Sequence, residues 1–102
     1  MFNIINRRAI LEYCKKYPAA KLALLVWYQK MSKSGYLNFN ELKNNYPDAS
    51  LVGDDRVIFN IMGNKFRLIV RIVFVYKLVQ VKWFGTHKEY DQIDPLNIDK
   101  KN

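Results

Sequence analysis

The six-residue stretch THKEYD, residues 86–91, contains the only histidine of the chain. Tyr90 follows His87 by three residues and Asp91 follows it by four, so a helix would place all three side chains on one face. The ordinary pKa of a histidine side chain lies near neutral pH, so an imidazole can accept or donate a proton under physiological conditions. With a tyrosine and a carboxylate beside it, such a group is suited to acid–base catalysis.

Part of the same stretch has a purely structural interpretation. Thr86 and Glu89 have the spacing of a capping box, in which each side chain accepts a backbone N–H at the start of a helix. This accounts for Thr86 and Glu89, which we take as supporting residues, but it leaves His87 and Tyr90 unexplained. Asp91 either positions the imidazole or completes the helical turn, and both interpretations stay open.

A predicted β-hairpin precedes this stretch and supplies positive charge. The dipeptide Gly63-Asn64 separates two runs rich in β-branched and aromatic residues, which is a strong signal for a two-residue turn. This turn pairs Asn60 with Arg67 and Arg56 with Arg71. Because side chains alternate between the faces of a sheet, the hairpin then has one apolar face and one face that carries all of its charge.

The turn after this hairpin contains no glycine, and we place it at Tyr76-Lys77. This count sets Lys82 opposite Arg71 and Thr86 opposite Arg67, so the THKEYD stretch starts beside the charged face. It also adds three residues to the apolar face: Val79, Val81 and Trp83.

The charged face belongs to a strongly basic chain. Seventeen Lys and Arg residues against nine Asp and Glu residues give a formal net charge of +8, which attracts polyanions such as nucleic acid. On one interpretation, the face binds RNA phosphates. On the other, its long side chains reach water and are neutralised by Asp54, Asp55 or the C-terminal acids. The residues that we expect to contact RNA are Arg56, Asn60, Arg71, Lys82 and Lys88.

The predicted elements indicate an α+β fold in a single domain, residues 1–102. We expect an N-terminal strand at residues 2–6 and two to three helices, at 7–17, 18–34 and 38–46. After a loop at 47–55, we expect strands at 56–62, 65–76 and 78–85. The helices then cover one face of a C-terminal antiparallel sheet and leave the other face open. Residues 96–102, beyond Pro95, are predicted to be a frayed tail.

The composition disfavours several classes of function. Cys14 is the only cysteine, so we expect a reduced core residue, and no Cys/His cluster indicates a zinc site. We expect no metal and no cofactor. No apolar run reaches the roughly 18 residues that a membrane span requires, so we expect a cytoplasmic protein without a membrane partner.

The C-terminal half resembles the HigB toxins of bacterial toxin–antitoxin pairs, within the RelE-like superfamily. The resemblance rests on the motifs VIFNIMGNKFRLIVRI and WFGTHKEYDQID, in this order, and on the arrangement of a strand and two helices before them. It implies a RelE-like fold and an mRNA interferase that cleaves translated mRNA on the ribosome. It also implies a HigA-like helix-turn-helix antitoxin that holds the toxin inactive and through which the complex binds operator DNA. By the motif, the catalytic residues are Lys65, Arg67, His87 and Tyr90.

These residue types suit a metal-independent cleavage of RNA, in which the 2′-hydroxyl attacks the adjacent phosphorus. We expect Lys65 and Arg67 to stabilise the phosphorane and His87 to donate a proton to the leaving oxygen. Tyr90 either orients the nucleotide or helps to move a proton. Two alternatives remain. The first is a ParE-like toxin that inhibits gyrase without cutting RNA, and the second is a non-enzymatic module that binds RNA or the ribosome.

Overall fold

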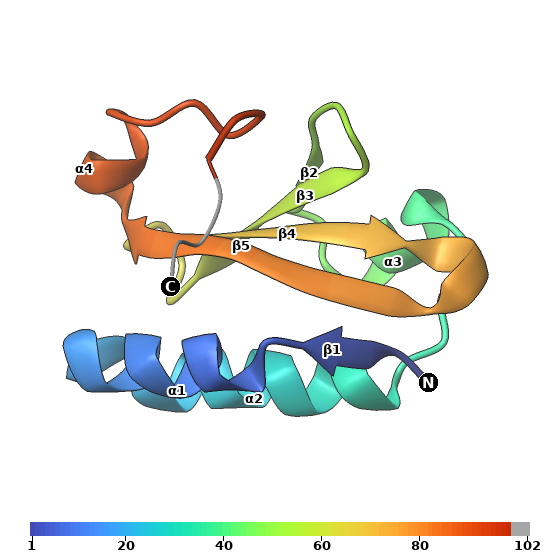
Figure 1. Ribbon diagram of the computed structural model, residues 1–102, viewed down its shortest axis with the longest axis horizontal. Helices are drawn as coiled ribbons and strands as arrows, with labels where there is room; N and C mark the ends of the chain where they lie inside the picture. The colour runs from blue at the N-terminus through green and yellow to red at the C-terminus, as the bar shows by residue number, and fades with distance from the viewer. Residues whose placement is uncertain (99–102) are drawn as a thin grey trace.

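The computed structural model describes residues 1–98, and Figure 1 shows a sheet with helices on one side and the C-terminal segment on the other. The helices are α1 (Arg7–Lys16), α2 (Lys21–Lys33), α3 (Phe39–Asn45) and α4 (His87–Tyr90), with short 3-10 turns η1 (Pro18–Ala20) and η2 (Phe74–Tyr76). The strands are β1 (Asn3–Ile5), β2 (Ser50–Leu51), β3 (Arg56–Ile61), β4 (Phe66–Val73) and β5 (Leu78–Thr86).

The strands form one sheet in the order β1-β5-β4-β3-β2. Neighbouring strands are antiparallel, except that β1 runs parallel to β5 and pairs with residues 78–80. The predicted α+β fold is confirmed, but the sheet is mixed because the N-terminal strand joins it. The segment 47–55, predicted as a loop, contains the short strand β2, which pairs with β3.

The β3–β4 hairpin has the predicted register, which places Asn60 opposite Arg67. The turn is closed by a hydrogen bond of 3.3 Å from the Lys65 N–H to the Met62 carbonyl oxygen. Gly63, at the first central position of this turn, has a φ of 65°, which glycine adopts without steric cost.

The β4–β5 turn differs from the prediction. The chain turns through η2 and Lys77, whose φ is 52° and whose N–H donates to the Phe74 carbonyl at 3.1 Å. Gln80, rather than Lys82, therefore lies opposite Arg71, a shift of two residues (82 − 80) from the predicted register. A shift of two keeps each side chain on its predicted face, because the side-chain period of a strand is two residues.

A β-bulge in β5 shifts the register once more, by one residue. Residues 69 and 70 of β4 pair with residues 83 and 81, so Lys82 is the extra residue on β5. A shift of one inverts the alternation of side chains beyond the bulge. Phe84 therefore enters the core, and the prediction that Trp83 lies on the apolar face is wrong.

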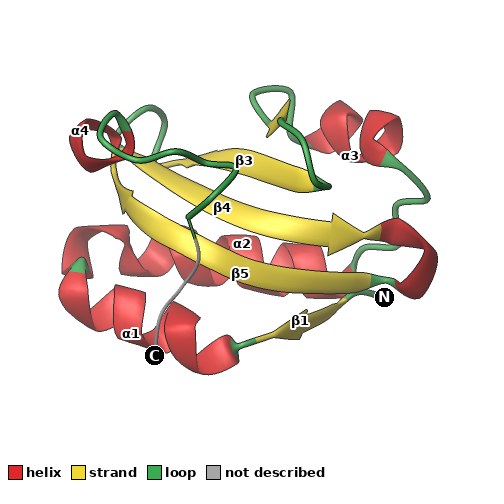
Figure 2. Cartoon of the chain, turned by 45° about the horizontal axis from the view of Figure 1, so that its top comes forward, coloured by secondary structure: helices red, strands yellow, loops and turns green. Residues whose placement is uncertain are grey.

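Helices α1 and α2 lie side by side along one face of the sheet and enclose the core (Figure 2). Cys14 of α1 is 6% exposed, as predicted for a core cysteine. Trp27 of α2 packs edge-on against Phe59 of β3, with ring centroids 5.4 Å apart. Helix α3 is capped by Asn38, whose side chain accepts the Glu41 N–H at 3.0 Å, so the predicted third helix is confirmed.

The prediction that the other face of the sheet is open is wrong, because the C-terminal segment crosses it (Figure 1). Arg56 is only 4% exposed, and its guanidinium donates to the carbonyl oxygens of Pro95 at 2.9 Å and Ile98 at 2.5 Å. Ile58 and Ile69 are buried outside the main core. Residues 96–98 are therefore held in place instead of frayed, and residues 99–102 lie outside the described part of the chain.

Candidate active site

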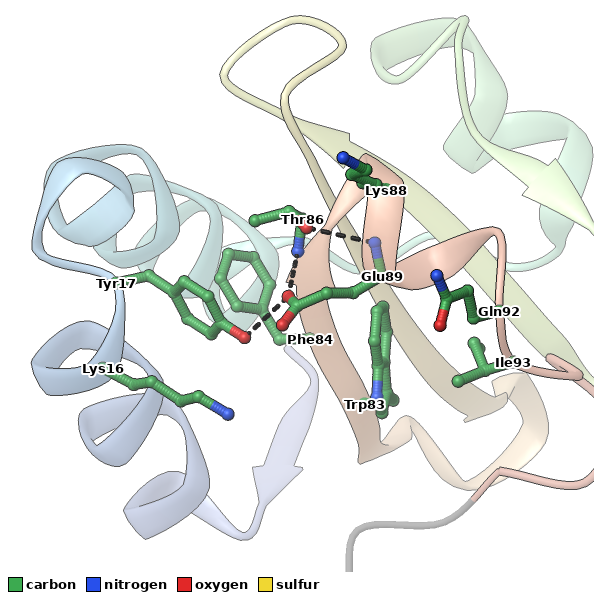
Figure 3. A pocket seen from close by; sticks show the side chains of 9 residues that line it. All are labelled: Lys16, Tyr17, Trp83, Phe84, Thr86, Lys88, Glu89, Gln92 and Ile93. Atoms are coloured by element: carbon green, nitrogen blue, oxygen red, sulfur yellow. Dashed lines mark hydrogen bonds between the residues drawn. The ribbon is translucent and has the colours of Figure 1, made fainter.

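Helix α4 begins at the end of β5 with the predicted capping box. Thr86 Oγ1 accepts the Glu89 N–H at 3.1 Å, and Glu89 Oε1 accepts the Thr86 N–H at 2.8 Å. The same carboxylate oxygen accepts the hydroxyl of Tyr17, just beyond α1, at 2.8 Å. Figure 3 shows these three side chains together. The capping box therefore also ties α4 to the end of α1.

Hydrogen bonding and burial shift the pKa values of both side chains in this contact. The backbone N–H of Thr86 and the hydroxyl of Tyr17 lower the pKa of Glu89. Burial raises the pKa of Tyr17 to about 12, and its bond to Glu89 adds to this effect. At neutral pH, Glu89 is thus a carboxylate and Tyr17 a neutral donor.

His87 lies where α4 meets the end of the β3–β4 hairpin. Its backbone N–H donates to the Lys65 carbonyl at 2.9 Å. Its Nε2 lies 3.9 Å from Asp91 Oδ2, one helical turn later, and the side chain is 45% exposed. Its Nδ1 is buried with no hydrogen-bond partner among the described residues. The imidazole is thus accessible to a substrate and close to a carboxylate, an arrangement suited to proton transfer.

Arg67, Tyr90 and Trp83 form a row beside this histidine. The guanidinium carbon of Arg67 lies 5.7 Å from the centre of the Tyr90 ring, and the Trp83 and Tyr90 ring centroids are 6.4 Å apart. Arg67 is opposite Gly85, so the predicted pairing of Arg67 with Thr86 is wrong by one residue. The Trp83 indole covers Gly85 closely, since a Cβ added to this glycine would lie 2.6 Å from Trp83 Cη2.

The hairpin presents the remaining residues that the motif indicates. Lys65 is exposed in the turn. Arg67 is half-buried, and one of its nitrogens donates to the side-chain oxygen of Asn64 at 2.6 Å, which holds the guanidinium at the turn. The described structure therefore brings together the four residues expected to be catalytic: Lys65, Arg67, His87 and Tyr90.

Two of the cations expected to contact RNA are instead engaged with the protein. Arg56 is buried beneath the C-terminal segment, so its expected position on an exposed face is wrong. Arg71 lies 3.6 Å from Asp54 and 3.6 Å from Asp55. For Arg71, the structure therefore favours the interpretation in which neighbouring aspartates neutralise the basic face.

The other residues expected to contact RNA remain closer to solvent. Lys88 is exposed on α4, whereas Lys82 is half-buried at the bulge and Asn60 is half-buried opposite Arg67. Lys82 does not lie opposite Arg71 as predicted, because the turn before it is longer than expected.

Sequence reasoning missed Tyr17 and misplaced Trp83. Tyr17 gives no sequence signal, because its partner Glu89 is 72 residues away along the chain. Trp83 gives none either, since regular alternation of the adjacent Trp83 and Phe84 directs one ring to each face without indicating which of them enters the core.

Within residues 1–98, no group of three or more His, Cys, Asp or Glu side chains could hold a metal ion. Over the same residues, no helix has the length and apolar character that a membrane span requires.

Comparison with known proteins places these residues in a family. Residues 20–93 match the model HigB_toxin, a RelE-like toxic component of a toxin–antitoxin system. Over 91 residues, the chain is 28% identical to the mRNA interferase toxin HigB of Escherichia coli K12, covering 87% of this chain and 88% of the relative. The mRNA interferase HigB of Shigella flexneri gives the same values. The mRNA interferase HigB of Escherichia coli O6:H1 is 29% identical over 93 residues, covering 89% of this chain and 90% of the relative.

Proposed function

Because the chain belongs to the HigB toxin family, we infer that it is an mRNA interferase, the toxic component of a toxin–antitoxin system. We assign this activity to particular residues because α4 contacts the hairpin turn. The bond from the His87 N–H to the Lys65 carbonyl, together with the position of Arg67 against Tyr90, sets an acid–base group among cations.

The proposed reaction is a metal-independent attack of the 2′-hydroxyl on the neighbouring phosphorus. A water molecule takes the proton of the 2′-hydroxyl while the 2′-oxygen bonds to phosphorus. The bond from phosphorus to the 5′-oxygen breaks, and a 2′,3′-cyclic phosphate remains. His87 donates the proton that the leaving 5′-oxygen requires, and Asp91, 3.9 Å from its Nε2, positions the ring. Lys65 and Arg67 stabilise the charge of the phosphorane, as fixed cations do when they lie where charge develops.

The remaining residues of the site bind the RNA or support the start of α4. Tyr90 orients the scissile nucleotide, while Thr86 and Glu89 hold the start of α4. Lys88 and Asn60 contact RNA beside the reacting group. We do not extend this role to Arg56 or Arg71, whose guanidinium groups contact carbonyl or carboxylate oxygens of the protein.

The proposed partners follow from the family. Membership of a toxin–antitoxin family implies an antitoxin. We propose that it is a HigA-like helix-turn-helix protein, and that the complex binds operator DNA through it. The proposed substrate is mRNA under translation on the bacterial ribosome, which places the active toxin in the cytoplasm.

The test is to induce the toxin in cells and to map the 5′ ends of transcripts, with and without active translation. We expect new ends within coding regions, and only when ribosomes translate. His87→Gln should lower the cleavage rate about 10²- to 10⁴-fold and Arg67→Ala about 10²- to 10³-fold. Lys30→Gln, an exposed change on α2, should leave cleavage intact.

The same experiment distinguishes the alternatives. A gyrase inhibitor would arrest growth without new transcript ends and would not need His87. A non-enzymatic RNA-binding module would likewise give no new ends. Full toxicity of both the His87 and the Arg67 variants, in folded protein, would refute the assignment of the site.

A further inference from the structure

A groove of about 520 Å³ lies beside the candidate active site, on the outer side of α4 (Figure 3). Its walls come from the end of α1, from the last part of β5 and from α4 with the residues that follow it. Strand β1 pairs with β5 only at residues 78–80, so β1 does not cover this part of the β5 edge. The groove therefore opens along a strand edge that leads to the start of α4.

The side chains lining this groove combine an aromatic surface with positive charge. Trp83 is half-buried, and its indole forms part of the groove wall. Lys16 and Lys88 are exposed at the groove, one on α1 and one on α4, and Gln92 adds an amide that can donate and accept. Single-stranded nucleic acid is bound by this combination: bases stack on aromatic rings while cations hold the phosphates.

One carboxylate in the groove restricts where a phosphate can lie. Glu89 is ionised at neutral pH, but one of its oxygens already accepts from Thr86 and Tyr17. Its negative charge disfavours a phosphate in the interior beside it. Phosphate is therefore expected at the rim, near Lys16 and Lys88, and the uncharged base in the interior against Trp83.

The groove is continuous with the proposed catalytic residues through two aromatic rings. Trp83 lies 6.4 Å from Tyr90 between ring centroids, and Tyr90 in turn lies under Arg67. A strand whose scissile phosphate is at Arg67 and His87 can thus place a neighbouring base on Trp83 by passing over Tyr90.

We propose that this groove is a subsite for a nucleotide next to the scissile bond of single-stranded RNA. The base stacks on Trp83, Gln92 contacts the base edge, and Lys16 and Lys88 bind the flanking phosphates. This proposal rests on the proposed function, because it assigns the groove to the same substrate. It also makes Trp83 and Gln92 determinants of sequence preference, distinct from the residues that perform the cleavage.

The first experiment measures stacking on Trp83 directly. The chain has two tryptophans, so Trp27→Phe leaves Trp83 as the only indole. A 2′-O-methyl trinucleotide, which cannot be cleaved, is titrated at low salt while the fluorescence is recorded. We expect saturable quenching, which weakens in the Lys16→Gln/Lys88→Gln double variant and persists in His87→Gln. Lys30→Gln, a charge change on α2, is the matched control and should bind as its parent does.

The second experiment keeps Trp27 and follows the anisotropy of a labelled trinucleotide of the same kind. Trp83→Leu should weaken binding about 5- to 150-fold, the range that corresponds to the stacking of one base on an aromatic ring. Unchanged affinity in Trp83→Leu would overturn the subsite. Equal quenching of Trp83 by a poly-glutamate peptide would also overturn it, because the groove would then be an acidic-peptide site.

These outcomes separate the subsite from the proposed function. If the trinucleotide binds at Trp83 but the wild-type toxin cuts no transcript, RNA binding in the groove stands, whereas its place next to a scissile bond falls with the interferase assignment. If transcripts are cut but the trinucleotide leaves Trp83 fluorescence unchanged, the interferase assignment stands and the subsite fails. With both intact, Gln92→Ala should redistribute the mapped cleavage positions, whereas His87→Gln should reduce all of them together.

Discussion

The side chains at α4 have two separate roles: some cap the helix, and others are available for catalysis. Thr86 and Glu89 satisfy the first backbone groups of the helix. His87 and Tyr90 take no part in that capping: the first lies near Asp91 and the second against Arg67. The two tasks can therefore be altered separately, so a loss of activity in His87→Gln should not require a loss of structure.

Gly85 is the position at which we expect the addition of a single methyl group to have a large effect on stability. An added methyl group would lie 2.6 Å from Trp83 and 2.9 Å from Glu89 Oε1, so Gly85→Ala must displace the indole or the capping carboxylate. We expect a loss of about 1–3 kcal/mol in the free energy of unfolding, measured by urea denaturation, together with reduced RNA cleavage. Gly35→Ala is the control, because its Cβ would meet nothing nearer than 3.9 Å. An unchanged urea midpoint in Gly85→Ala would show that Trp83 is not packed as described.

Among the secondary-structure elements, α4 depends on its neighbours because it is only four residues long. Isolated helices of this length are not stable in water, so the helix needs its cap and its contacts. The Tyr17–Glu89 bond ties it to α1, and the bond from the His87 N–H to the Lys65 carbonyl ties it to the hairpin. The proposed acid is thus positioned by two elements that are distant along the chain.

The Tyr17–Glu89 bond should make stability depend on pH. The pKa of Glu89 lies below its ordinary value of 4.5 in the folded state, chiefly because of the Thr86 backbone and Tyr17 bonds. The carboxylate therefore stabilises the fold above pH 4.5, and this contribution is lost as the pH falls through the lowered pKa. We expect Tyr17→Phe to lower the urea midpoint clearly at pH 7 and much less at an acidic pH at which Glu89 is protonated. Tyr28→Phe is the control and should give a difference that does not vary with pH. Equal effects of Tyr17→Phe at both pH values would contradict this account.

The strand register shows what the sequence does and does not specify. The β3–β4 register was predictable because a Gly-Asn turn and strict alternation both determine it, and a slip would bury Arg67. The β4–β5 register was not, because the turn contains no glycine and instead places Lys77 at a positive φ. The bulge at Lys82 then changed the faces of Trp83 and Phe84. The four residues of the proposed catalytic set were still brought together, because the two errors partly cancel.

Across the whole molecule, the sheet separates two layers with different roles. The helices α1 and α2 enclose the main core on one side, and α4 with the C-terminal segment lies on the other (Figure 1). The position of the C-terminal segment could not be predicted, because the contacts that hold it are side-chain bonds to backbone carbonyls. Arg56 makes these bonds to Pro95 and Ile98, which are 39 and 42 residues away along the chain, and no periodicity in the sequence indicates such contacts.

The C-terminal layer should loosen when Arg56 is replaced. Arg56→Leu removes both hydrogen bonds to the Pro95 and Ile98 carbonyl oxygens and leaves Asp54 with Arg71 as its neighbouring guanidinium. We expect a loss of about 1–3 kcal/mol in the free energy of unfolding. We also expect faster limited proteolysis within residues 92–98, measured by mass spectrometry. Arg8→Leu, at an exposed position, is the control for loss of charge, and the protease should cleave it at the wild-type rate. Unchanged proteolysis in Arg56→Leu would mean that other contacts hold the segment.

The single inserted residue in β5 has a consequence for how such a protein can acquire a new binding surface. If Lys82 were an ordinary strand residue and not a bulge, regular alternation from the core residue Val81 would direct Trp83 into the core and Phe84 toward solvent. The bulge therefore determines which of two adjacent aromatic residues is available to a substrate, while β5 remains paired with β4 on both sides of it. Among related toxins, the gain or loss of this bulge at constant strand length would be a direct route to altered RNA preference.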